Sequence, residues 1–105
     1  MTKNEVLEAL TAAKNAPYVA GSISGCGRAY VCITSSNDRS VVNAVATACR
    51  QLGLLFERKG HYGTGKNSIY IGYDNADGRA LARSKVFAKV LSDRGIPAYD
   101  DAVSD

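Results

Sequence analysis

The residues from 59 to 68, KGHYGTGKNS, could bind a phosphate because they nearly match a nucleotide-binding loop. Such a loop follows the pattern G-x-x-x-x-G-K-[ST], in which the final hydroxyl ligates magnesium. Residues 60–67 match it until the last position, where Asn67 stands. A phosphate-binding loop also leads into a helix, whereas the residues that follow, SIYIGYD, are typical of a strand. We therefore interpret the segment as the glycine-rich tip of a β-hairpin.

This hairpin tip still gathers positive charge around an aromatic residue. The residues concerned are Arg58, Lys59, His61, Tyr62 and Lys66. Cations on such a tip could contact the phosphates of a nucleic acid or an acidic protein surface. The alternative is a solvated hairpin end with no ligand.

Two tyrosines fall on segments that we predict to be neighbouring strands, RAYVCITS (28–35) and NSIYIGYD (67–74). Side chains alternate between the two faces of a strand. One face would carry Val31, Ile33, Ile69 and Ile71 and form the core. The other face would carry Tyr30, Cys32, Ser68, Tyr70 and Gly72. Tyr30 and Tyr70 could then form a platform on which nucleic-acid bases stack.

The segment KNSIYIGY (66–73) resembles, in layout, the RNP1 motif of RNA-recognition domains. The positions that match are Lys66, Tyr70, Ile71 and Tyr73. The segment departs from the motif at Ser68, where the first stacking aromatic would stand, and it lacks both glycines. The resemblance implies single-stranded RNA bound on the sheet face. The competing hypothesis is that the N-terminal helix or a second copy of the chain covers this face, because protein interfaces favour tyrosine.

The sequence offers little for catalysis or metal binding. His61 is the only histidine, and Cys26, Cys32 and Cys49 show no C-x-x-C spacing. We expect no metal, no cofactor and no enzymatic activity. The alternative is an enzyme that uses His61 in the glycine-rich loop.

Hydrophobic periodicity and capping residues predict the elements that position these side chains. We expect helices over 3–15, 38–52 and 77–94, strands over 28–35, 54–59 and 67–74, and a short final strand over 96–99. After the first helix the order is β-α-β-β-α-β. This order predicts an α+β protein with a ferredoxin-like (split β-α-β) antiparallel sheet and both helices on one face.

Length and composition predict one domain over residues 1–105, with 1–16 as an N-terminal helix and 100–105 as an acidic, disordered tail. No stretch is long and apolar enough to span a membrane, and the net charge of +3 is mild. We expect a cytoplasmic protein with no membrane partner.

The most plausible function is a small binding module that acts through protein–protein interaction or self-association as a homodimer. Inhibitors and adaptors of this size are common among phage and mobile-element proteins. The alternative partner is a single-stranded nucleic acid, bound by the tyrosine face and the basic hairpin loop.

Overall fold

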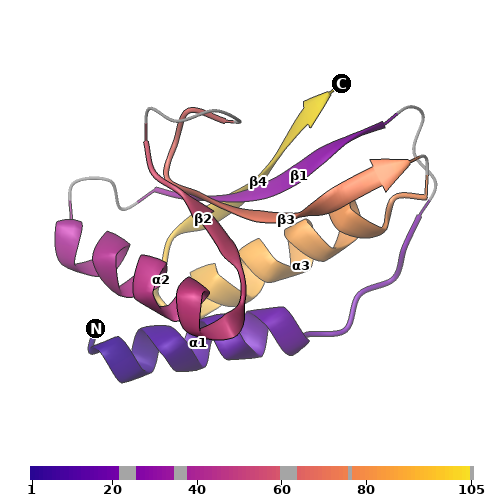
Figure 1. Cartoon of the computed structure of the whole chain (residues 1–105). Helices are drawn as coiled ribbons and strands as arrows, with labels where there is room; N and C mark the ends of the chain where they lie inside the picture. Colours follow the sequence, from indigo (N-terminus) through magenta and orange to yellow (C-terminus); the bar gives the residue numbers. More distant parts are fainter. Residues whose placement is uncertain (22–25, 35–37, 60–63, 76, 105) are drawn as a thin grey trace.

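The computed structural model describes residues 1–21, 26–34, 38–59, 64–75 and 77–104. In this part of the chain three helices and four strands follow one another (Figure 1). They are α1 (Lys3–Asn15), β1 (Cys26–Ile33), α2 (Arg39–Leu52), β2 (Leu55–Glu57), β3 (Ser68–Asn75), α3 (Arg79–Asp93) and β4 (Ala98–Ser104). None of these helices is long and apolar enough to cross a membrane.

The strands form one antiparallel sheet in the order β2-β3-β1-β4. This is the predicted α+β, ferredoxin-like arrangement, with β1 and β3 at the centre and α2 and α3 on one face. We call the face away from these helices the open face.

The N-terminal helix α1 lies on the far side of α2 and α3 from the sheet (Figure 1). It packs against both helices, and Lys14 Nζ donates a hydrogen bond of 2.9 Å to the Leu52 carbonyl at the end of α2. Three layers result: the sheet, then α2 with α3, then α1. The hypothesis that α1 covers the open face is therefore wrong.

Local sequence explains where the helices begin and end. Thr2 and Glu5 form the predicted capping box, in which the side chain of each accepts from the backbone N–H of the other. Gly53 ends α2 with a φ of 72°, a left-handed conformation that glycine adopts without strain. Asp74 of β3 caps α3 from outside the helix, because its carboxylate accepts from the N–H groups of Ala80 at 2.7 Å and Leu81 at 2.9 Å.

The core fills the space between the sheet and α1. Its largest fully buried side chains include Leu10 of α1, Ile69 of β3, and Phe87 and Leu91 of α3. The helix stripes and the strand face predicted from periodicity meet here. Burial of these apolar side chains is the main source of stability.

A β-bulge between β1 and β3 corrects one predicted position. Ala29 pairs with Gly72 and Tyr30 pairs with Tyr70, so Ile71 is the extra residue. Gly72 therefore faces α3 instead of the open face, and a Cβ built on it would lie 3.2 Å from the Cβ of Ala80.

The acidic C-terminal segment is also corrected. Residues 98–104 form β4, and Asp100 and Asp101 pair with Val31 and Tyr30 of β1. The expected disordered tail is thus wrong for residues 100–104. Pairing with β1 satisfies backbone groups of both strands, and Lys85 Nζ lies 3.8 Å from the Asp100 carboxylate.

Candidate anion-binding groove

Tyr30 and Tyr70 lie together on the open face as predicted, but they do not form a platform. Their ring centroids are 5.5 Å apart in an edge-to-face arrangement, and Tyr30 is only 1% exposed. Burial, and then the nearby charge of Glu57, raise the pKa of Tyr30. A ring covered in this way offers no face to a base, so the predicted stacking role of Tyr30 is corrected. Alternation along a strand fixes the face of a side chain but not what covers it.

The connection between β2 and β3 also contacts the open face, at Ser68. Thr64, in the connection between β2 and β3, donates a hydrogen bond of 3.1 Å to the Ser68 hydroxyl on the open face. Cys32 on the neighbouring strand is fully buried, and burial raises its pKa. His61 and Tyr62, which we predicted to bind a ligand, lie outside the described residues.

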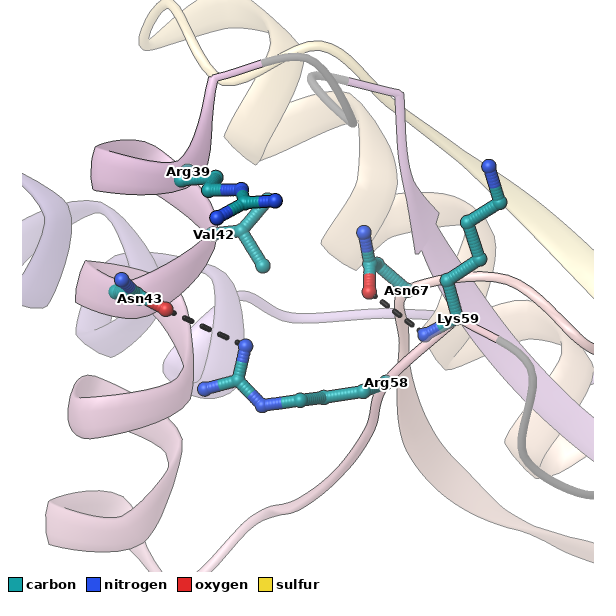
Figure 2. Close-up of a pocket in the computed structure, with 6 residues that line it drawn as sticks. All are labelled: Arg39, Val42, Asn43, Arg58, Lys59 and Asn67. Carbon is teal, nitrogen blue, oxygen red and sulfur yellow. Dashed lines mark hydrogen bonds between the residues drawn. The ribbon is translucent and has the colours of Figure 1, made fainter.

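Two of the remaining predicted cations, Arg58 and Lys59, line the space between α2 and the hairpin (Figure 2). A hollow of about 400 Å³ lies there, lined by Arg39, Val42, Asn43, Arg58, Lys59 and Asn67. Arg58 runs from the end of β2 toward α2, and Arg39 reaches from α2 into the same space. Two guanidinium groups thus come from segments far apart in the sequence.

Hydrogen bonds fix the backbone and side chains around this hollow. Arg58 Nη1 donates to Asn43 Oδ1 at 3.3 Å, and the Arg58 guanidinium lies 5.9 Å from the Phe56 ring centre. Asn67 accepts from the N–H of Lys59 at 2.8 Å through its side-chain oxygen. The residue that breaks the nucleotide-loop pattern therefore has a structural role, because it joins the two sides of the hairpin.

Two further hollows of about 290 Å³ each adjoin the first. One shares Arg58 and is lined by Ala46, Arg50, Leu54, Leu55 and Phe56 as well. The other shares Lys59 and Asn67 and is lined by Ile33, Thr34, Lys66 and Tyr99 as well. We call the three together the basic groove. Its five cations are Arg39, Arg50, Arg58, Lys59 and Lys66.

The basic groove carries net positive charge, because no aspartate or glutamate is among the described residues that line its three hollows. Within the described ranges, the ion pairs are Lys85–Asp100 and Lys89–Asp93, and neither includes a groove cation. Interaction with the Tyr99 hydroxyl, and to a smaller extent the charge of Asp101, raises the pKa of Lys66. Arginine and lysine in such a site attract phosphate or carboxylate groups.

The sequence predicted three of the five cations and missed the two on α2. Arg39 and Arg50 line the groove together with Asn43 and Ala46. These positions recur at helical spacing, so they share one face of α2. That periodicity could have been read from the sequence. The position of Tyr99 beside the groove could not be predicted from the sequence, because it depends on how β4 pairs with β1.

The three cysteines differ in exposure, since Cys32 and Cys49 are buried. Cys26 is exposed and donates to Asn75 Oδ1 at 3.0 Å. Burial raises the pKa of the Cys49 thiol to about 12. Among the residues that the structure describes, no group of three or more His, Cys, Asp and Glu side chains could hold a metal ion.

No protein-family model matches the chain, and neither does any curated protein or solved structure.

Proposed function

We propose that the protein is a non-catalytic binding module that holds the phosphate backbone of a nucleic acid in the basic groove. The observation that carries this proposal is the row of three adjoining hollows, whose described lining residues include five cations and no acid. Lysine and arginine contacts with phosphates supply most of the affinity of sequence-independent nucleic-acid binding.

A polymer of phosphates fits this arrangement better than a single small anion. One phosphate could engage Arg39 and Arg58 in the central hollow, but Arg50 and Lys66 line the separate hollows on either side. Successive phosphates of one strand could contact them in turn. The guanidinium group also matches phosphate oxygens with two parallel hydrogen bonds.

The test is a fluorescence-anisotropy titration of a short labelled oligonucleotide with two triple variants of equal charge. One removes groove cations (Arg39→Gln, Arg58→Gln and Lys59→Gln), and the control removes exposed α3 cations (Arg79→Gln, Lys85→Gln and Lys89→Gln). Three lost phosphate contacts at a slope of about 0.7 each should weaken binding roughly 100-fold at about 0.1 M salt. The control should bind nearly as the wild type does. Equal losses, or no binding by the wild type at low salt, would reject the proposal.

Protein binding through the open face is the second candidate. Two large apolar side chains on this face are exposed, Leu55 at 59% and Tyr73 at 48%, and α1 does not cover them. A second copy could bury both. Sedimentation velocity should then show a dimer that Leu55→Asp dissociates and that Val19→Asp, at a 91% exposed position outside the sheet, leaves intact. A wild type that stays monomeric at high concentration would exclude self-association.

A further inference from the structure

Tyr99 places an aromatic ring at one end of the basic groove. It lies on β4 opposite Cys32 of β1, and its side chain lines the same hollow as Lys59 and Lys66. It is 37% exposed, whereas Tyr30 is 1% exposed. Of these two tyrosines, therefore, only Tyr99 presents ring surface to a ligand in the groove.

Lys66 lies over this ring, with its ammonium nitrogen 5.2 Å from the ring centroid. The ammonium also interacts with the Tyr99 hydroxyl, and a cation–π contact contributes little at an exposed site. The Lys66 side chain is itself exposed. A phosphate would compete with the ring for the ammonium group. The side chain can therefore move to a phosphate and uncover the ring without any change in the fold.

We propose that the basic groove binds single strands, with one unpaired base stacked on Tyr99 while adjacent phosphates contact Lys59 and Lys66. This inference rests on the proposed function. Base stacking on an aromatic side chain is available to every base and needs no specific sequence. A duplex keeps its bases paired and stacked inside the helix, so it can offer its phosphates to the groove but no base to Tyr99.

The experiment compares two oligomers of equal length and charge, oligothymidylate and an abasic deoxyribose-phosphate chain. Stacking of one base makes binding roughly 5-fold to 150-fold tighter. The wild type should therefore prefer oligothymidylate by a ratio in this range. Tyr99→Phe keeps a ring and should keep the ratio, whereas Tyr99→Leu should bring it close to one. Tyr73→Leu, at an exposed tyrosine on β3, is the matched control and should leave the ratio unchanged.

The outcomes separate this inference from the proposed function. Equal binding of both oligomers by the wild type overturns the stacking role and leaves phosphate binding in place. A preference that survives in Tyr99→Leu also overturns it, because the base then stacks elsewhere. If neither oligomer binds at low salt, the proposed function fails and this inference fails with it.

Discussion

Replacement of Arg39 by glutamine tests whether the basic groove contacts phosphates. Arg39 is the first residue of α2 and is exposed, and Arg79 has the same place and exposure on α3. Arg39 lines the central hollow, whereas Arg79 lines none of the three hollows of the groove. Arg79→Gln therefore removes an equal charge from an equivalent helix position. A difference in oligonucleotide affinity between the two variants would therefore come from the position of Arg39 in the groove and not from the loss of net charge.

The size of the effect follows from counterion release. Each phosphate contact contributes about 0.7 to the slope of log affinity against log salt for a single strand. Five engaged cations would give a slope near −3.5, and loss of Arg39 would reduce it to about −2.8. Binding would weaken about 5-fold at about 0.1 M salt, and less than 2-fold at about 0.5 M.

Anisotropy titrations over a series of salt concentrations measure both slopes, and thermal unfolding checks that each variant is folded. We expect the reduced slope for Arg39→Gln and the wild-type slope for Arg79→Gln. An unchanged slope for Arg39→Gln, or equal changes in both variants, would refute the assignment of Arg39 to a phosphate contact.

Three further predictions concern the fold. Iodoacetamide should modify Cys26 rapidly and Cys49 only on unfolding, because burial raises the pKa of Cys49 to about 12; mass spectrometry of digested protein identifies the site. Asp74→Asn should cost roughly 0.5–2 kcal/mol at neutral pH, because the amide offers the first turn of α3 one acceptor oxygen in place of two and no negative charge. Burial alone would raise the pKa of Asp74. Hydrogen bonds from the first turn of α3 lower this pKa by more than burial raises it, so the net shift is downward. The stabilisation by the Asp74 carboxylate is therefore lost as pH falls through this lowered pKa. The free energies of unfolding of the wild type and Asp74→Asn, measured in urea, should converge in strong acid. Gly53→Ala should cost about 1 kcal/mol because φ is 72° there, whereas Gly21→Ala, with no neighbouring atom within 4 Å, should have little effect.

Much of the fold could be predicted because local signals agree with the tertiary structure. The capping box at Thr2 and the apolar stripe that follows it predict α1 over the residues that form it. The last strand was predicted too short because Asp100 and Asp101 resemble a solvated tail. Their pairing with β1 is a tertiary effect, and no local pattern encodes it.

The candidate site was predicted only in part, for similar reasons. Charge clustering within the hairpin was visible, so Arg58 and Lys59 were identified. Strand alternation placed Tyr30 and Tyr70 correctly on one face, but the burial of Tyr30 depends on neighbouring side chains. The bulge that turns Gly72 toward α3 also has no signature in the alternation pattern.

The most direct test of the central claim is a map of backbone amide chemical shifts in ¹⁵N-labelled protein during titration with an oligonucleotide. If the basic groove binds phosphates, the largest changes should occur at Arg39, Asn43, Lys59 and Asn67, and the side-chain amide signals of the two asparagines should move with them. Changes concentrated around Tyr73 and other open-face residues outside the groove, with the signals of the central hollow unmoved, would contradict the account.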